Sequence, residues 1–135
     1  KTEITLAGRK INDGMLNYIT KELNFFLKKK NKSLKNSKIM IVGLTYKAGV
    51  ADMRNSLNFK IFKKIKKYNN KIYGCDPFVT KNIKITYGIY NNVNKNINYD
   101  AILFLSYHRI FKKIYNNIVS SKNRNKILDP FNYYS

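Results

Sequence analysis

Cysteine is nearly absent from this sequence of 135 residues, in which Cys75 is the only one. A single cysteine excludes a disulfide framework and a cysteine-rich zinc module, and it agrees with a reducing compartment. Apolar runs are also short, and none approaches the roughly 18 residues that a membrane span requires. We therefore expect a cytoplasmic protein that does not bind a membrane. The length predicts one main domain rather than two full ones.

Acidic residues are scarce as well: the sequence has seven Asp and Glu against 27 Lys and Arg. Three of the seven fall within the first 30 residues and the other four are spread over the rest. This spacing shows neither the paired carboxylates of acid–base catalysis nor a cluster of metal ligands. We expect no catalytic residue and no metal site in this sequence.

The net charge of +20 raises the question of a polyanion partner such as nucleic acid. Of the 27 cations, 23 are Lys and only four are Arg, whereas recognition of bases and phosphates favours the planar guanidinium. Lys, Asn and Ile make up 60 of the 135 residues, and AT-rich codons encode all three. Drift in codon usage therefore also explains the charge. A basic nucleic-acid-binding α/β module remains the alternative function, and lysines gathered on one concave face would favour it.

Hydrophobic periodicity predicts a long amphipathic helix from Asn12 to Lys30, where apolar residues recur at the three-and-four spacing of one helix face. Further helices are expected at residues 59–68, 91–99 and 110–118. Short apolar runs predict strands at residues 38–44, 71–75, 83–87, 101–105 and 126–129. This alternation is typical of an α/β protein with a parallel sheet and helices on both faces.

Ligands of such sheets bind beyond the carboxyl ends of the strands. That rule brings the loop after Leu44, the turn at 76–77 and the segment 106–109 to one edge. Residues 43–49 lack the second and third glycines of G-x-G-x-x-G and do not form a Walker A loop. We therefore predict no cofactor-binding residue here.

The loop after the first strand carries two cations, Lys47 and Arg54, just before the next helix. The free N–H groups at the start of that helix add partial positive charge, so a diphosphate would suit this arrangement. Alternatively, Asp52 and Arg54 pair with each other or cap the helix, and spacing alone leaves both open.

Three other candidates are weaker. His108 has no acid or nucleophile pattern beside it, so we expect it to begin a helix. Cys75 ends an apolar strand and is better interpreted as a small buried hydrophobe. Asp76 stands where the ribose-binding acid of a dinucleotide site would stand, but the glycine fingerprint is missing.

Four blocks of the sequence, in order and spacing, resemble the C-terminal part of the UDP-glucose/GDP-mannose dehydrogenase family. They are LAGRKINDGM (6–15), IMIVGLTYKAGVADMRNS (39–56), IYGCDPF (72–78) and DAILFLSYHRIFK (100–112). The first block is most similar to the branch that acts on UDP-N-acetylhexosamines. The resemblance implies a Rossmann-like three-layer α/β domain with a parallel sheet, preceded by a long amphipathic helix.

The resemblance also implies a function. Members of the family oxidise C6 of a nucleotide-linked sugar from alcohol to carboxylate with two NAD⁺, here for surface polysaccharide synthesis. They join an N-terminal NAD-binding domain, a central helical region that makes the dimer, and a C-terminal domain that binds the nucleotide of the substrate. Their nucleophilic cysteine lies in a G-G-x-C-x-P segment that this sequence lacks, and Cys75 is not that residue.

We therefore expect residues 1–35 to be the end of the central dimerisation region and residues 36–135 to be the UDP-binding domain. The sequence begins with Lys1 rather than Met, so we expect a segment of a longer enzyme. NAD is expected on the missing N-terminal domain and not on this fragment, which we expect to be inactive alone.

Carried over by position, the resemblance assigns the substrate contacts. The expected substrate-binding residues are Tyr46, Lys47, Arg54, Asn12 and Arg9. Tyr46 and Lys47 match an aromatic–Lys pair, with Lys47 as the phosphate or sugar ligand. Arg54 matches the Arg of a D-x-R-x-S block, which orders the loop or contacts the anion. Asn12 belongs to an R-x-x-N-D block beside the cleft that Arg9 also approaches.

The sequence departs from the family at Phe131, where many members carry an Arg two residues after the acid of the last strand. A phosphate anchor is lost there or is supplied by another residue such as Arg109. The expected partners are a UDP-sugar and a second copy bound through the N-terminal helix, without nucleic acid. In isolation that helix would expose an apolar face and cause self-association, so a pure dimerisation scaffold is a third possible function.

Overall fold

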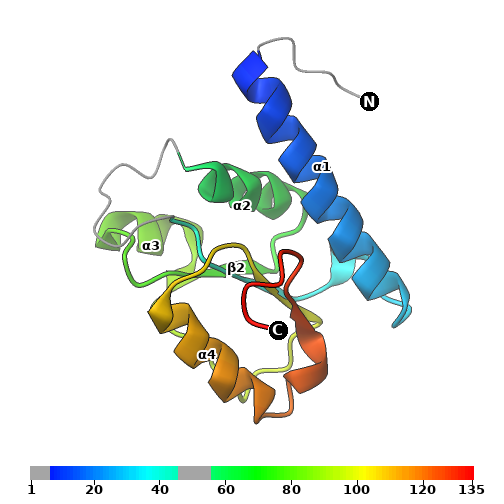
Figure 1. Cartoon of the computed structure of the whole chain (residues 1–135), viewed down its shortest axis with the longest axis vertical. Helices are drawn as coiled ribbons and strands as arrows, with labels where there is room; N and C mark the ends of the chain where they lie inside the picture. Colours follow the sequence, from blue (N-terminus) through cyan, green and yellow to red (C-terminus); the bar gives the residue numbers. More distant parts are fainter. Residues whose placement is uncertain (1–6, 46–55) are drawn as a thin grey trace.

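The computed structural model describes residues 7–45 and 56–135, with side chains from residue 14 onward. Five short strands form one parallel sheet in the order β3-β2-β1-β4-β5 (Figure 1). The strands are β1 (Ile39–Val42), β2 (Ile72–Cys75), β3 (Ile89–Tyr90), β4 (Ala101–Phe104) and β5 (Ile127–Leu128). The α-helices are α1 (Ala7–Lys28), α2 (Leu57–Tyr68), α3 (Lys81–Tyr87) and α4 (Arg109–Val119).

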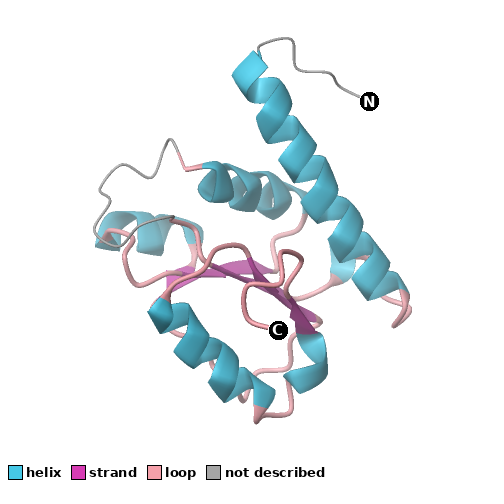
Figure 2. Cartoon of the chain, viewed as in Figure 1, coloured by secondary structure: helices cyan, strands magenta, loops and turns pink. Residues whose placement is uncertain are grey.

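Helices cover both faces of the sheet, with α1 and α2 on one side and α4 on the other (Figure 2). Strand β1 lies in the middle and all four of its residues are buried. Ile39 and Ile41 belong to the core on the side of α1 and α2, whereas Met40 and Val42 belong to the core beside α4. A continuous apolar run is what a strand buried on both faces requires. The predicted Rossmann-like three-layer α/β fold with its long preceding helix is confirmed.

Helix α1 packs on this domain through one face. Ile19, Leu23 and Leu27 recur every four residues and are fully buried, in the same core as α2. The apolar face that we expected α1 to expose is therefore covered by the chain itself over residues 14–28, where the side chains are described. The rings of Tyr18 and Phe25, 41% and 62% exposed, lie outside that contact.

One predicted strand is wrong, because residues 83–87 belong to helix α3. The helix ends at Gly88, which adopts the left-handed conformation (φ 71°) and whose N–H donates to the carbonyl of Lys84. Such a glycine cap turns the chain out of the helix. The strand on this edge of the sheet, β3, begins immediately afterwards and has two residues.

The helix predicted at 91–99 is also wrong, because this segment is irregular, with one turn and several bends. Two of its asparagines bond to the backbone next to them: Asn92 Oδ1 accepts from the N–H of Val93 (2.8 Å), and Asn94 Oδ1 accepts from that of Asn96 (2.9 Å). These short-range bonds compete with helical hydrogen bonds. The connection from β3 to β4 therefore crosses one face of the sheet without a helix.

None of the helices in the described ranges is both long and apolar enough to cross a bilayer.

Candidate functional site

The carboxyl ends of the three central strands meet at one edge of the sheet. Val42 ends β1 and lies in register with Cys75 of β2 and with Phe104 of β4. The residues that follow these strands, 43–45, 76–78 and 105–108, therefore gather at this edge. We call it the carboxyl edge, and it agrees with the placement that the order of the elements predicts.

Asp76 organises the carboxyl edge from within. The residue is fully buried, and its Oδ2 accepts hydrogen bonds from the N–H of Leu44 (2.8 Å), the N–H of Thr45 (2.9 Å) and the Thr45 hydroxyl (2.9 Å). Its Oδ1 accepts a fourth bond from the N–H of Phe78 (2.9 Å). Bonds to an ionised acceptor are stronger than neutral ones. Asp76 thus fixes the chain where it leaves β1, and its oxygens are used by the protein rather than by a ribose.

The start of helix α2 is tied to the same place. The Ser56 hydroxyl donates to the carbonyl of Leu44 (2.6 Å) and accepts from the N–H of Phe59 (3.3 Å), which caps the helix. Asn58 Nδ2 donates to the carbonyls of Gly43 (3.2 Å) and Leu105 (3.4 Å). The segment between Thr45 and Ser56 therefore begins and ends at one anchored point of the carboxyl edge.

Close packing at this point requires a glycine. Gly43 has φ +93°, and a Cβ there would collide with the Ser106 hydroxyl and lie 3.0 Å from the Ser106 nitrogen. The Ser106 hydroxyl instead donates to the carbonyl of Thr45 (3.1 Å). Strands β1 and β4 are thus joined just beyond their ends.

The C-terminal segment reaches the same edge. The Tyr134 hydroxyl donates to the carbonyl of Ser106 (2.6 Å) and accepts from the N–H of His108 (3.2 Å). Burial raises the pKa of Tyr134 to about 12, so the phenol stays protonated at neutral pH. The half-exposed ring of Tyr107 stacks on the ring of Tyr134 with 5.3 Å between centroids. These contacts make a rigid aromatic platform beside the strand ends.

The predicted substrate-binding side chains lie beyond what the structure describes. Tyr46, Lys47 and Arg54 fall in the segment 46–55, outside the described residues. Arg9 and Asn12 belong to helix α1, at positions whose side chains are not described. Their assignment therefore stays a prediction.

Two further residues named from the family pattern are described. Arg109 is exposed at the first position of α4, beside the carboxyl edge. Phe131 packs against the rings of Tyr18 (5.9 Å) and Tyr133 (5.6 Å), and the Tyr18 hydroxyl donates to the carbonyl of Pro130 (3.4 Å). At the position where the resemblance leads us to expect an Arg, this chain joins its C-terminal segment to helix α1 through contact of aromatic rings.

The weaker candidates of the sequence have structural roles. His108 Nδ1 accepts from the N–H of Ile110 (3.1 Å) and caps α4, as expected of a residue that begins a helix. Cys75 is fully buried, and burial, together with the Asp76 carboxylate, raises the pKa of its thiol to about 12. A protonated thiol is a poor nucleophile. Within the described ranges no group of His, Cys, Asp and Glu is placed to hold a metal ion.

Sequence reasoning brought Ser106 to this edge within the segment 106–109 but gave it no role, and it missed Asn58 and Tyr134. A usable signal was present for Ser106, a polar residue directly after the apolar strand 101–105. Nothing local marks Tyr134, because its partners lie 26 and 28 residues away.

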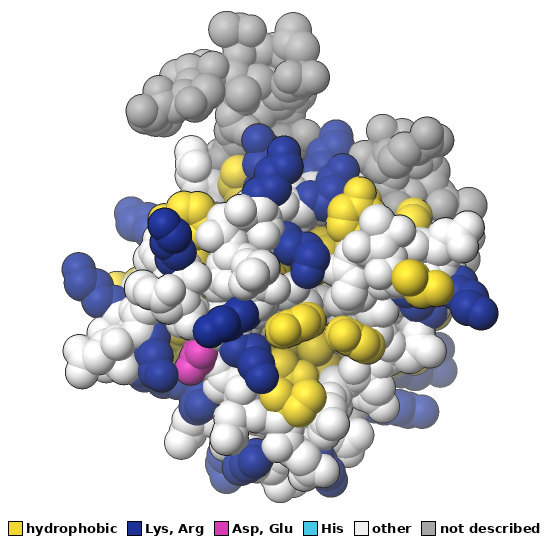
Figure 3. Space-filling model, turned by 180° about the vertical axis from the view of Figure 1, so that it is seen from behind, with side chains coloured by type: hydrophobic (Ala, Val, Ile, Leu, Met, Phe, Trp, Pro, Cys, Tyr) yellow, Lys and Arg dark blue, Asp and Glu magenta, His cyan; other side chains and the backbone are white. Residues whose placement is uncertain are grey.

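The lysine distribution bears on the nucleic-acid alternative. On the face seen in Figure 3, cationic side chains are scattered around the surface and do not gather into one stripe. This spread over the visible, described part favours lysines at ordinary solvated positions over a built phosphate-binding surface.

Comparison with known proteins adds independent information. The model of the UDP-glucose/GDP-mannose dehydrogenase family, UDP binding domain, matches residues 40–135. The UDP-N-acetyl-D-glucosamine 6-dehydrogenase of Salmonella typhi is 35% identical over 114 residues, which cover 83% of this chain and 27% of that protein. The enzyme of the same name from Pseudomonas aeruginosa is 31% identical with the same coverage.

A solved structure agrees with these matches. That of the UDP-D-ManNAc dehydrogenase from Pyrococcus horikoshii matches with a TM-score of 0.69 and 27% identity, over 94% of this chain and 29% of that one. The chain therefore spans little more than a quarter of the length of these relatives.

Proposed function

This chain belongs to the UDP-glucose/GDP-mannose dehydrogenase family, and from this premise we propose that it is the substrate-binding part of an NAD-dependent UDP-sugar 6-dehydrogenase. The complete enzyme would oxidise the C6 hydroxyl of a UDP-N-acetylhexosamine, or of UDP-glucose, to the uronic acid. Its relatives that act on UDP-N-acetyl-D-glucosamine and UDP-D-ManNAc support the first class of sugar. Residues 36–135 would bind the nucleotide.

One observation carries the proposal: both ends of the segment 46–55 are anchored at the carboxyl edge, the place where open parallel sheets bind ligands. Asp76 holds the end at Thr45, and Ser56 holds the other end and caps α2. We assign the diphosphate to Lys47 of this segment, with Tyr46 and Arg54 beside it. Arg9 and Asn12 of helix α1 would approach the sugar.

Lys47 supplies a charge-assisted contact in this proposal. A charge-assisted hydrogen bond to a diphosphate oxygen contributes about 1.5–3 kcal/mol. Loss of that bond weakens binding roughly 10- to 150-fold, since about 1.4 kcal/mol corresponds to tenfold.

Titration calorimetry of UDP and UDP-N-acetylglucosamine against the Lys47→Ala variant tests this. We expect the weakened binding at an unchanged melting temperature, because Lys47 lies between the anchors and not in them. The matched control is Lys35→Ala, which removes an exposed lysine at the opposite edge of the sheet and should leave binding unchanged. Equal affinity of the Lys47→Ala variant and the unchanged chain would remove Lys47 from the site.

Oxidation requires parts beyond this chain. NAD and the nucleophilic cysteine would come from the remainder of the enzyme, since Cys75 is buried and protonated. We propose that residues 1–35 end the dimerisation region and that a homodimer forms through the N-terminal helix, in the cytoplasm. The exposed ring of Phe25 on α1 is available for such a contact. A monomeric sedimentation profile of the full enzyme would contradict the dimer.

A further inference from the structure

A second concave site lies on the α4 face of the sheet, between Lys38 before β1 and Tyr90 at the end of β3. Because the connection 91–99 is not helical, it covers β1 and β2 incompletely and leaves a pocket of about 380 Å³. A pocket of this size can hold a small ligand. It is lined by Lys38, Met40, Tyr73, Tyr90, Asn92, Asn94, Ile97 and Tyr99.

Three tyrosines make the walls. The rings of Tyr73 and Tyr90 lie 6.4 Å apart at 48° to each other, and Tyr90 is half exposed. Tyr99 is almost fully buried, and its backbone is fixed from both sides: its N–H donates to Asn123 Oδ1 (3.3 Å), and its carbonyl accepts from Lys126 Nζ (2.8 Å). The backbone that carries the Tyr99 wall is therefore held in place before any ligand binds.

The polar groups of the pocket are mostly donors. The Oδ1 atoms of Asn92 and Asn94 already accept from the N–H groups of Val93 and Asn96, which leaves their amide nitrogens to donate. Burial, with the neighbouring Cys75, Tyr90 and Tyr73, raises the pKa of Tyr99 to about 12, so this phenol also keeps its proton.

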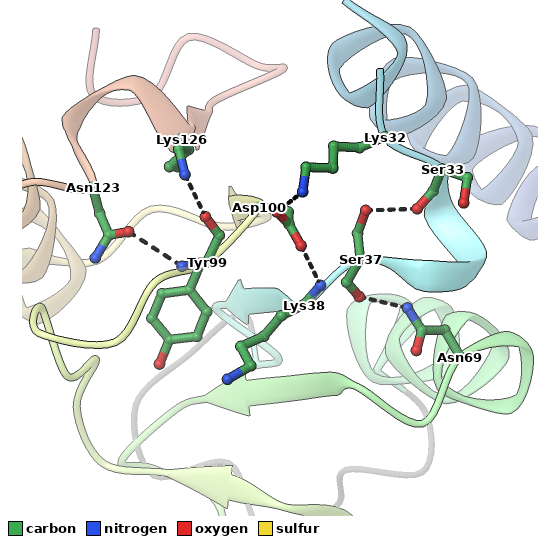
Figure 4. A network of polar contacts seen from close by, with 9 residues as sticks. All are labelled: Lys32, Ser33, Ser37, Lys38, Asn69, Tyr99, Asp100, Asn123 and Lys126. Carbon is green, nitrogen blue, oxygen red and sulfur yellow. Dashed lines mark hydrogen bonds and ion pairs between the residues drawn. The ribbon is translucent and has the colours of Figure 1, made fainter. Parts of the chain in front are cut away.

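Lys38 provides the positive charge. Its backbone is bound to Asp100, whose Oδ2 accepts from the Lys38 N–H (2.8 Å) and whose N–H donates to the Lys38 carbonyl (2.8 Å). The side chain extends away from Asp100, to the same side as the Tyr99 hydroxyl (Figure 4). The other oxygen of Asp100 pairs with Lys32 at 3.5 Å. Among the described residues that line the pocket there is no acid, so the Lys38 ammonium is not neutralised there.

We propose that this pocket is a second ligand site, which binds an anion attached to a planar ring, of the size of a nucleoside monophosphate. The ring stacks on Tyr90 and Tyr73, and the phosphate meets the Lys38 ammonium and the asparagine amides. Lys38 precedes β1, and roughly 13 Å of strand separates its backbone from the carboxyl edge. Tyr90 lies nearer to that edge, because it is in register with Cys75 and its carbonyl accepts from the Asp76 N–H (2.9 Å). The inference does not depend on the proposed function, because none of the residues that line this pocket is among those proposed to bind the UDP-sugar.

The test is an NMR titration of the ¹⁵N-labelled chain with AMP, adenosine and inorganic phosphate. AMP is expected to shift the amide signals of Lys38, Asn92 and Asn94 saturably. Adenosine and phosphate should each bind roughly tenfold more weakly, because each lacks one half of the recognised group. Absent shifts at millimolar AMP, or shifts concentrated at Thr45 and Ser106, would overturn the proposal.

Two variants keep the test specific. Lys38→Met removes the ammonium, and Tyr90→Ala removes a half-exposed wall; each should weaken AMP binding roughly tenfold while the remaining spectrum is unchanged. Lys35→Met is the matched control, since it removes the same charge from an exposed position outside the pocket. Equal losses in the Lys38 and Lys35 variants would mean diffuse attraction to a basic protein and refute a built site. If AMP bound no more tightly than adenosine, the pocket would not recognise the phosphate. If AMP bound no more tightly than inorganic phosphate, the pocket would not recognise the ring.

Discussion

Asp76→Asn is the substitution whose effect the carboxyl edge predicts most sharply. The side chain keeps its shape but loses its charge and exchanges one oxygen for an NH₂ group. With the amide oxygen at the Oδ2 position, three acceptor bonds remain, and the NH₂ group faces the N–H of Phe78. The opposite orientation is worse, because the NH₂ group then faces the N–H groups of Leu44 and Thr45.

The magnitude follows from these contacts. Bonds to a charged acceptor contribute about 1.5–3 kcal/mol each and neutral ones about 1 kcal/mol, and a buried donor without an acceptor costs about 1–3 kcal/mol. Each of the three retained bonds loses about 0.5–2 kcal/mol and the unsatisfied N–H costs about 1–3 kcal/mol, so the free energy of unfolding falls by at least about 2.5 kcal/mol. At about 4 °C for each kcal/mol in a domain of this size, the melting temperature falls by at least roughly 10 °C.

Urea unfolding followed by circular dichroism measures the loss. Asp100→Asn is the matched control at the other edge of the sheet. Asp100 accepts one backbone bond, from Lys38, and pairs with the half-exposed Lys32, so we expect a loss of about 1 kcal/mol or less. A loss for Asp76→Asn no greater than that of the control would refute the role of the buried carboxylate. Hydrogen exchange at Leu44 and Thr45 should accelerate in the Asp76 variant alone.

Two further predictions concern backbone and pH. Gly43→Ala should lower the free energy of unfolding by about 2–4 kcal/mol, because φ is positive there and the new Cβ would collide with Ser106. Gly14→Ala should raise the free energy of unfolding by about 0.5–1 kcal/mol, because its Cβ meets nothing within 4 Å. Thermal melts in which the Gly43 variant is the more stable of the two would contradict this prediction. In the folded state the pKa is about 12 for Cys75, Tyr99 and Tyr134, above the ordinary values of 9.0 for cysteine and 10.0 for tyrosine. Between pH 9 and pH 12 the folded state therefore binds more protons than the unfolded state, and the free energy of unfolding falls as the pH rises through that window. The midpoint of urea unfolding should therefore be lower at pH 10.5 than at pH 8. Because Cys75 is buried, iodoacetamide should label it at pH 8 only after the protein is unfolded.

Most of the fold was predictable because its long elements carry strong periodic signals. Helices α1, α2 and α4 and strands β1, β2 and β4 lie where apolar spacing places them. The failures lie between β2 and β4, where β3 has only two residues and the chain is rich in Asn. There, one glycine cap and a few bonds from side chains to the backbone decide the structure, and no hydrophobic pattern records them.

The location of the candidate site was predictable from the sequence, but the hydrogen bonds that hold its backbone were not. Strand order alone brings the correct segments to the carboxyl edge. The use of Asp76 was not predictable, because its partners at Leu44 and Thr45 lie 32 and 31 residues away in the sequence. The local sequence does not distinguish an acid at a strand end that binds a ligand from one that accepts hydrogen bonds from the backbone. Only the assembled sheet shows which role the residue has. The substrate contacts rest on the family resemblance, since spacing alone left Arg54 open between a ligand and a helix cap.

The common anchoring of Thr45 and Ser56 has an evolutionary consequence. The hydrogen bonds that fix its two boundaries come from Asp76, Thr45, Leu44 and Ser56, and none of these bonds involves a side chain of the ten residues between Thr45 and Ser56. In the proposed function this stretch carries the diphosphate contacts, so selection can alter its remaining residues at little cost in foldability.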